Sequence, residues 1–155
     1  MQINIIAVGT KMPTWVTTGY NEYATRLSKY CKINLIELPL ATARKNNNPN
    51  VAKKLESDQI IARLNKQDYI IALDLNGKEY PTEKFSEYLN NLSIKTHAVT
   101  LLIGGPDGLS DECLSLAKDK IALSQFTLPH PLVRVILVEQ LYRAFSLLNN
   151  HPYHK

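Results

Sequence analysis

The sequence has few cysteines and no long hydrophobic run, and each absence removes a class of protein. Cys31 and Cys113 are its two cysteines, and no C-x-x-C motif accompanies them, which argues against a disulfide scaffold and a structural zinc site. No apolar run approaches the roughly 18 residues that a membrane-spanning helix needs, and the first residues lack the basic region of a signal peptide. We therefore expect a cytoplasmic protein with no metal and no membrane partner.

The motifs of several common enzyme classes are also absent. Residues 8–13 lack the G-x-G-x-x-G spacing of dinucleotide-binding folds, and Gly77-Lys78 lacks the other residues of a P-loop. No G-x-S-x-G or H-E-x-x-H motif occurs. His151 and His154 lie three residues apart, but no nearby Cys, Asp or Glu completes a metal site. A Rossmann enzyme, an NTPase and a metalloenzyme are thus disfavoured.

Positive charge is moderate overall and concentrated in one stretch. The 155 residues include 18 Lys and Arg against 14 Asp and Glu, a net charge of +4. Residues 44–66 hold six basic side chains: Arg44, Lys45, Lys53, Lys54, Arg63 and Lys66. Such a stretch attracts phosphate groups of a polyanion. The alternative, which charge alone favours, is a solvated helix face.

Short β-branched runs alternate with helical patterns along the whole chain. The runs predict strands at residues 2–8, 33–38, 69–73, 98–103 and 121–124. Apolar residues at helical spacing predict helices at 14–31, 51–64 and 82–92, a short helix after Ser110, and a last helix at 130–148. Thr82 and Ser110 are the expected caps of their helices. This alternation predicts a single α/β domain, residues 1–155, built as a sandwich with a mainly parallel sheet.

The last predicted helix, residues 130–148, is apolar over most of its circumference. Between Leu132 and Leu148 the polar residues are Arg134, Glu139, Gln140, Arg143 and Ser146. One face of a sheet in so small a protein does not easily cover such a helix, so a second subunit is a natural cover. We therefore predict a homodimer that uses this helix. The alternative, equally compatible with the pattern, is that the helix is the central core element.

Two segments at predicted strand ends are candidates for a ligand pocket. Residues 101–108 (Leu-Leu-Ile-Gly-Gly-Pro-Asp-Gly) follow a buried strand, and residues 123–131 join a strand end to a proline-started helix. In open α/β sheets ligands bind beyond the carboxyl ends of the strands, where glycine lets the backbone approach a flat ligand. The two segments therefore predict two walls of a pocket. For the first, a tight turn that needs glycine for its own geometry is the alternative.

Several long motifs occur in order from the first residue to the last and resemble one family. They are Gly9-Thr10-Lys11-Met12-Pro13-x-Trp15-Val16, residues 102–110, residues 127–135, residues 139–144 and Asn150-His151-Pro152-Tyr153-His154. The sequence resembles the ribosomal RNA large subunit methyltransferase H family, SPOUT-class enzymes that methylate N3 of a pseudouridine. The one departure noted is Asp107, where the family frequently has Glu.

This resemblance implies a fold, a cofactor and a substrate. It implies a trefoil knot over about residues 98–150, a homodimer, and S-adenosylmethionine bound in a bent shape within the knot. The implied substrate is a pseudouridine of 23S ribosomal RNA within an assembled ribosome. By motif position, the implied cofactor-binding residues are Leu73, Gly104, Gly105, Leu123, Ser124, Gln125, Phe126, Thr127 and Leu128.

Methylation at an imino nitrogen requires that the nitrogen lose its proton, which a positioned base or cation favours. The candidates for catalytic residues are His130, Arg143, Tyr153 and His154. For His130 the alternative is a residue at a helix start bonded to the backbone, and for Arg143 it is an ion pair with Glu139 at i, i+4. Tyr153 and His154 lie in a short tail, which the resemblance implies is ordered by the partner subunit's pocket.

Other residues are candidates for contact with RNA. Arg134 and the basic stretch 44–66 are predicted to bind phosphates, and Trp15 and Tyr20 are candidates for stacking on an extruded base. For Trp15 the favoured alternative is a core aromatic at the start of a helix. The alternative function for the whole chain is a non-enzymatic RNA- or nucleotide-binding α/β module that uses its glycine loop only as a turn.

Overall fold

Five parallel strands form one sheet in the computed structural model, which describes residues 1–42 and 48–155, with the backbone alone for His154. The strands are β1 (Gln2–Val8), β2 (Lys32–Leu38), β3 (Tyr69–Lys78), β4 (Ala98–Ile103) and β5 (Asp119–Ile121). Their order across the sheet is β2-β1-β4-β3-β5, and every neighbouring pair is parallel. The predicted α/β class with a mainly parallel sheet is confirmed.

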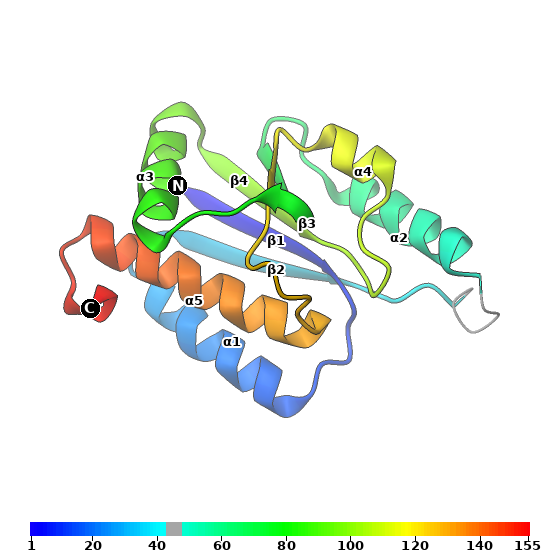
Figure 1. Cartoon of the computed structure of the whole chain (residues 1–155), viewed down its shortest axis with the longest axis horizontal. Coiled ribbons are helices and arrows are strands. Elements are labelled where there is room, and N and C mark those ends of the chain that lie inside the picture. The colour runs from blue at the N-terminus through cyan, green and yellow to red at the C-terminus, as the bar shows by residue number, and fades with distance from the viewer. Residues whose placement is uncertain (43–47) are drawn as a thin grey trace.

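Helices cover both faces of this sheet (Figure 1). On one face lie α1 (Thr14–Leu27), α3 (Thr82–Lys95) and α5 (His130–Leu148). On the other face lie α2 (Pro49–Arg63) and α4 (Asp111–Leu116), and a short 3-10 helix, η2 (Pro152–His154), follows α5. None of the helices in the described part of the chain is both long and apolar enough to cross a membrane.

The core is divided into two layers by the sheet, and β1 contributes to both. Ile3 and Ile5 pack in the cluster beneath α1, α3 and α5, whereas Ile6 and Val8 pack in the cluster beneath α2 and α4. Successive side chains of a strand point to opposite faces, so a strand covered on both sides needs an almost continuous apolar run. That is the pattern from which residues 2–8 are predicted to form a strand.

The two edge segments around β5 differ from the prediction. The predicted strand 121–124 lies instead at 119–121, because the chain leaves the sheet after Ala122 donates its N–H to the Lys78 carbonyl at 3.1 Å. β3 extends to Lys78, and both Leu73 and Lys78 pair with Ile121. Residues 74–77 therefore form a bulge in β3 rather than a free turn, although Asn76-Gly77 is a turn signal in the sequence.

Helix ends are set partly by the predicted caps. The Ser110 hydroxyl accepts a hydrogen bond from the Cys113 N–H at 3.2 Å, as expected of the residue that caps α4. Thr82 does not cap α3: Pro81 precedes the helix, and the Thr82 hydroxyl donates to the side chain of Gln140 at 3.3 Å. α1 ends at Leu27, four residues earlier than predicted.

α5 is the central element of its layer, between α1 and α3 (Figure 1). Leu137 and Leu141 on its inner side are fully buried. The outward row is only partly buried and consists of Leu132, Ile136, Glu139 and Arg143. Residues spaced in this way share one face of a helix. The interpretation of α5 as a core element therefore holds for its inner face, whereas its outward row stays partly exposed.

Candidate functional site

A cavity of about 830 Å³ lies beyond the carboxyl ends of β3, β4 and β5. Three segments form most of its lining: residues 73–76 of β3, a glycine loop at 103–109, and the segment 121–130 that leads into α5. A cavity of this size is typical of sites for small molecules and cofactors, and its place beyond the strand ends is where open α/β sheets bind ligands.

The structure brings together eight of the nine residues expected to bind the cofactor. Those that line the cavity are Leu73, Gly104, Gly105, Leu123, Ser124, Phe126, Thr127 and Leu128. The ninth, Gln125, is exposed and lies outside the lining. His130 also lines the cavity. Residues separated by some fifty positions in the sequence thus meet at one place.

The glycine loop is shaped by its own backbone contacts. A Cβ on Gly104 would lie 2.5 Å from the carbonyl carbon of Gly108 and 2.8 Å from the Leu109 nitrogen. Gly108 has a φ of +79° and donates its N–H to the Gly105 carbonyl at 2.9 Å. A Cβ on Gly105 would lie 2.6 Å from Glu56 Oε2. The glycines are therefore needed for the turn itself, and the same turn forms a wall of the cavity.

Charged residues that were not predicted to bind the cofactor also line the cavity, and one of them, Lys53, belongs to the basic stretch 44–66 that is predicted to bind phosphates. Three carboxylates, Asp74, Asp107 and Asp111, and one amine, Lys53, belong to the lining. Asp74 directly follows Leu73 at a strand end, which is a signal that the sequence does contain. Lys53 reaches the cavity from α2, so its place follows from tertiary packing alone. The excess of negative charge suits a cationic ligand.

His130 stands where β1 and β4 end, at the first position of α5. Its ring lies beside the backbone of Val8 and Gly104, and its Nε2 is 3.4 Å from Nη2 of Arg134. Burial, followed by the charge of Arg134, lowers the pKa of His130 below its usual value. The imidazole is therefore neutral near pH 7 and is able to accept a proton.

Arg134 is buried in the fold, with 1 % of its surface exposed. Its Nη1 donates to Oε2 of Glu37 at 2.6 Å, and its Nη2 donates to the carbonyls of Val8 and Gly9. The guanidinium thereby ties α5 to the ends of β1 and β2. The prediction that Arg134 binds phosphate is wrong, because the guanidinium is enclosed and both of its terminal nitrogens bond within the protein.

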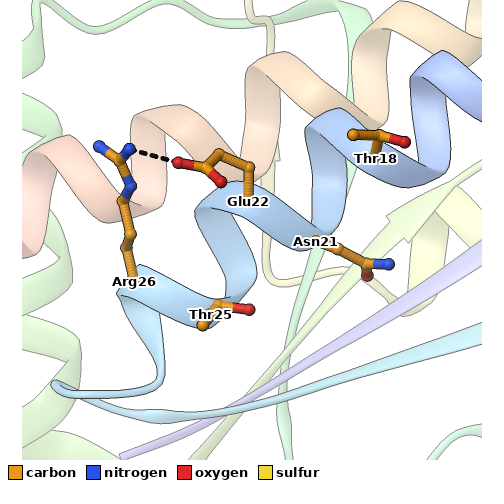
Figure 2. Close-up of a pocket in the computed structure, with 5 residues that line it drawn as sticks. All are labelled: Thr18, Asn21, Glu22, Thr25 and Arg26. Atoms are coloured by element: carbon orange, nitrogen blue, oxygen red, sulfur yellow. Dashed lines mark hydrogen bonds and ion pairs between the residues drawn. The ribbon is translucent and has the colours of Figure 1, made fainter.

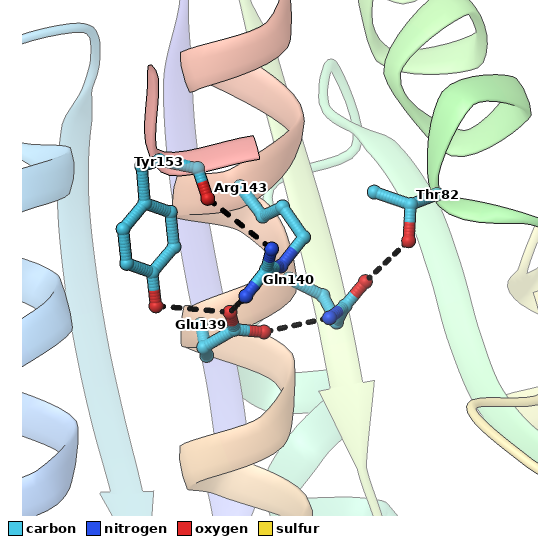
Figure 3. A network of polar contacts seen from close by, with 5 residues as sticks. All are labelled: Thr82, Glu139, Gln140, Arg143 and Tyr153. Carbon is cyan, nitrogen blue, oxygen red and sulfur yellow. Dashed lines mark hydrogen bonds and ion pairs between the residues drawn. The ribbon is translucent and has the colours of Figure 1, made fainter. Parts of the chain in front are cut away.

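Arg143 and Tyr153 lie in a separate polar cluster near the C-terminal end of α5 (Figure 3). Oε1 of Glu139 accepts from Arg143 Nε at 2.9 Å and Nη2 at 2.7 Å, and from the Tyr153 hydroxyl at 3.1 Å. At about 1.5 Å per residue, roughly 20 Å of helix separates Arg143 from His130. Within one chain these candidates therefore do not meet at the cavity. The side chain of His154 lies outside the described residues.

The aromatic and basic residues predicted to contact RNA differ in how exposed they are. Trp15 is 56 % exposed, so its interpretation as a core residue is wrong, whereas Tyr20 is buried and does not present its ring for stacking. Burial raises the pKa of Tyr20 to about 12. In the basic stretch, Lys54 pairs with Asp58 on the surface of α2. Arg44 and Lys45 lie outside the described residues.

A shallow polar surface on the outward face of α1 is a second hollow of the molecule (Figure 2). Its residues are Thr18, Asn21, Glu22, Thr25 and Arg26, all of them exposed. All come from one helix, and Arg26 forms an ion pair with Glu22. This surface is therefore the solvated side of α1 and lacks the converging segments of the cavity.

Comparison with known proteins agrees with this geometry. The family described as predicted SPOUT methyltransferase matches residues 1–154. The ribosomal RNA large subunit methyltransferase H of Saccharophagus degradans is 50 % identical over 155 residues, covering all of both chains. The protein of the same name from Francisella tularensis subsp. novicida is 46 % identical, again over all of both chains.

Solved structures show the same fold at low sequence identity. A probable methylase family protein from Haemophilus influenzae Rd KW20 has a TM-score of 0.55 and 13 % identity, covering 96 % of this chain and 66 % of that one. A tRNA (m1G37) methyltransferase from Aquifex aeolicus has a TM-score of 0.50 and 12 % identity, covering 90 % and 68 %. The family match over residues 1–154 and the two full-length relatives show that the chain belongs to the ribosomal RNA large subunit methyltransferase H family of SPOUT methyltransferases.

Proposed function

We propose that the protein transfers a methyl group from S-adenosylmethionine to N3 of a pseudouridine in 23S ribosomal RNA, on assembled ribosomes in the cytoplasm. Family membership supports the reaction class. The observation that carries the proposal is the cavity at the ends of β3, β4 and β5, because the glycine loop, the segment 121–130 and a neutral His130 converge there.

The cavity suits S-adenosylmethionine in size and charge. Its volume of about 830 Å³ exceeds what a small cofactor fills, and its ionised side chains carry an excess of negative charge. When bound, this cofactor supplies a methyl group on a positively charged sulfur. The eight predicted residues that line the cavity would hold it: apolar side chains such as Leu73 and Leu123 against its flat base, and the backbone of Gly104 and Gly105 against its polar groups.

We place a trefoil knot at about residues 98–150, around this cavity. Ile121 pairs with both Leu73 and Lys78, so residues 74–77 of β3 bulge out beside Ile121. A Cβ on Gly77 would lie 2.6 Å from the backbone of Ile121, which shows how closely the two segments pass. The chain then returns from the sheet edge to α5 in the middle of its layer. This close passage supports a threaded path, although threaded chains are rare.

The chemistry requires alignment of N3 with the methyl carbon and a destination for the N3 proton. The walls of the cavity supply alignment, which is worth several kcal/mol in an in-line displacement. His130 is neutral and lines the cavity, so it is placed to accept the proton as the new N–C bond forms. The polar cluster at the other end of α5 would stabilise the developing anion if a second subunit brought it to the cavity.

We also propose that the protein is a homodimer whose subunits pair along α5. The outward row includes Leu132 and Ile136, apolar side chains that a partner helix would cover. A two-fold axis across α5 sets the two helices antiparallel, so the C-terminal end of one lies beside the N-terminal end of the other. Arg143, Tyr153 and His154 of each subunit would then approach the cavity of its partner.

Replacing Ile136 with glutamate should therefore turn a dimer into a monomer and abolish methylation. A charge at the centre of an apolar interface is left desolvated and unpaired, which costs several kcal/mol of association. Sedimentation at micromolar concentration measures the change. Ile94→Glu is the matched control, because Ile94 is 78 % exposed on α3. A monomeric protein before any substitution contradicts the dimer.

The function is tested by two measurements on the same protein. Calorimetry should show binding of S-adenosylmethionine, and mass spectrometry of 23S rRNA from incubated ribosomes should show one added methyl group on a pseudouridine. Free rRNA, incubated in parallel, tests whether the assembled ribosome is required. RNA binding that ignores S-adenosylmethionine, with no methylation, would instead identify a non-enzymatic RNA-binding module.

Replacing His130 with glutamine should lower methylation at saturating cofactor about 100-fold, the scale of a lost general base. The dissociation constant of S-adenosylmethionine should change little. His97→Gln is the matched control, since His97 is an exposed residue far along the chain from α5. Equal activity of the two variants would remove His130 from the reaction.

The same residue makes stability depend on pH in a predictable direction. Because the pKa of folded His130 is lowered from 6.5, the unfolded chain binds this proton more readily than the folded chain. The stability that the neutral ring contributes is therefore complete above about pH 6.5 and is lost as the pH falls through the folded value. Urea denaturation at pH 7 and pH 5 should show a larger loss in the unsubstituted protein than in His130→Gln.

A further inference from the structure

A carboxylate at the edge of the sheet binds two tyrosine hydroxyls. Oδ2 of Asp119 accepts a hydrogen bond from the Tyr69 hydroxyl at 2.7 Å and another from the Tyr88 hydroxyl at 2.6 Å. Asp119 is the first residue of β5, Tyr69 begins β3, and Tyr88 lies in α3. This cluster, which we call the Asp119 clamp, thus joins β5 to two elements whose tyrosines lie 31 and 50 residues before Asp119 in the chain.

Both tyrosines are held in the protonated form that donates. Burial and the hydrogen bond to Asp119 raise the pKa of Tyr69 to about 12 and raise that of Tyr88 further. The rings are packed as well: Tyr80 lies 5.2 Å from Tyr88, and the ammonium of Lys118 lies 5.1 Å from the ring of Tyr69. Hydrogen bonds to a charged acceptor are about twice as strong as neutral ones, so this clamp is a firm attachment.

β5 needs such an attachment because it is short and lies at the edge of the sheet. It has three residues, and just outside it Lys118 N bonds to the Ile70 carbonyl at 2.8 Å and Ala122 N to the Lys78 carbonyl at 3.1 Å. A strand of this length at a sheet edge has few backbone bonds and frays easily. The side-chain bonds of Asp119 add to the few that the backbone supplies.

The segment that follows β5 is a wall of the cavity. Residues 123–129 contain no helix or strand, and most of them line the cavity before His130 begins α5. We call residues 123–129 the donor loop. Its position is set by the two elements that it joins, β5 at one end and α5 at the other. Asp119 itself does not line the cavity, so any effect on a ligand must pass through this loop.

We propose that Asp119 is a positioning residue for the donor loop: by tying β5 to β3 and α3, it holds the loop in the shape that receives S-adenosylmethionine. The identity of the ligand rests on the proposed function. The attachment itself rests on the two hydrogen bonds and on the short edge strand, which are independent of the reaction.

Replacing Asp119 with alanine should raise the dissociation constant of S-adenosylmethionine about tenfold, since the loss of two bonds to a charged acceptor exceeds the 1.4 kcal/mol of one decade. At saturating cofactor, methylation should return to near the unsubstituted rate. Asp119→Asn keeps an acceptor oxygen without the charge and should lie between the two. Asp58→Ala is the matched control, because Asp58 is exposed and pairs with Lys54 on α2.

Hydrogen exchange gives a readout that needs no activity. In the ligand-free protein, amides of the donor loop and of β5 should exchange about tenfold faster in Asp119→Ala, with the exchange of β1 unchanged. If that variant does not fold, the double variant Tyr69→Phe, Tyr88→Phe removes the same two bonds and keeps both rings.

Each outcome decides one of the two proposals. Unchanged cofactor affinity together with unchanged exchange, in a folded variant that lacks the clamp, overturns the role of Asp119. The role of Asp119 is also overturned if the variant loses as much methylation rate at saturating cofactor as it loses cofactor affinity. A loop that is only displaced would return to its binding shape when excess cofactor occupies the cavity, so the rate would recover. If the unsubstituted protein binds no S-adenosylmethionine, the proposed function fails, while loop exchange still tests the clamp.

Discussion

Replacing Gly104 with alanine is expected to weaken the binding of S-adenosylmethionine more than about 100-fold, the scale of a backbone shift worth 3 kcal/mol or more. The new Cβ would lie 2.5 Å from the carbonyl carbon of Gly108 and 2.8 Å from the Leu109 nitrogen. These are backbone atoms, so no flexible side chain can move away, and the glycine loop itself must shift. A wall of the cavity is displaced as a result.

Gly108→Ala is the matched control for this variant. A Cβ there meets no atom within 4 Å, so the only cost is a positive φ of +79°, about 1 to 2 kcal/mol for an alanine. Calorimetry should show nearly normal affinity in Gly108→Ala and none in Gly104→Ala, with urea denaturation confirming that both are folded. Normal affinity in Gly104→Ala would remove the glycine loop from the site. Substitution of Gly105 is less informative, because its side chain would strike Glu56.

Replacing Arg134 with methionine is expected to lower the free energy of unfolding by about 3 kcal/mol, the range for breaking a buried ion pair. Its side chain is 2 % exposed, and its removal leaves the carbonyls of Val8 and Gly9 without these donors. The side chain of Glu37 is 37 % exposed and stays partly hydrated, which places the loss at the lower end of that range.

Arg143→Met is the control, since it removes an arginine from the same helix. The side chain of Arg143 is 27 % exposed, so the ion pair with Glu139 is partly screened and its loss should cost about 1 kcal/mol or less. Urea denaturation of both variants measures the difference. A similar loss in the two would contradict the role of Arg134 as the tie between α5 and the strand ends.

The arrangement of strands and helices follows from local pattern, and its exceptions come from tertiary contacts. Buried parallel strands require continuous apolar runs, so residues 2–8 and 98–103 are recognisable without a structure. Asn76-Gly77 has the composition of a turn, yet the pairing of Lys78 with Ile121 draws this segment into β3. A contact between residues more than forty positions apart cannot be predicted from the composition of either segment.

Some residues of the candidate site are likewise predictable from sequence, whereas others are seen only in the structure. The glycine loop alone is an ambiguous signal, because a tight turn also needs glycine, and it predicts a pocket only together with the segment 123–131 and the family resemblance. Lys53 and Asp119 are not predictable, since one reaches the cavity from a helix on the other face and the other acts through a tyrosine pair. For Arg143, the predicted helix 130–148 already implies roughly 20 Å of separation from His130. The bond of the Tyr153 hydroxyl to Glu139 appears only in the structure.

The order of elements along the chain determines when the cavity comes into existence during synthesis. The bulge of β3 lies near the middle of the chain, whereas the glycine loop, the donor loop and His130 follow within residues 103–130. Chains emerge from the ribosome N-terminus first. A nascent polypeptide halted before β5 would therefore lack the edge strand, the donor loop and His130, and with them one wall of the cavity.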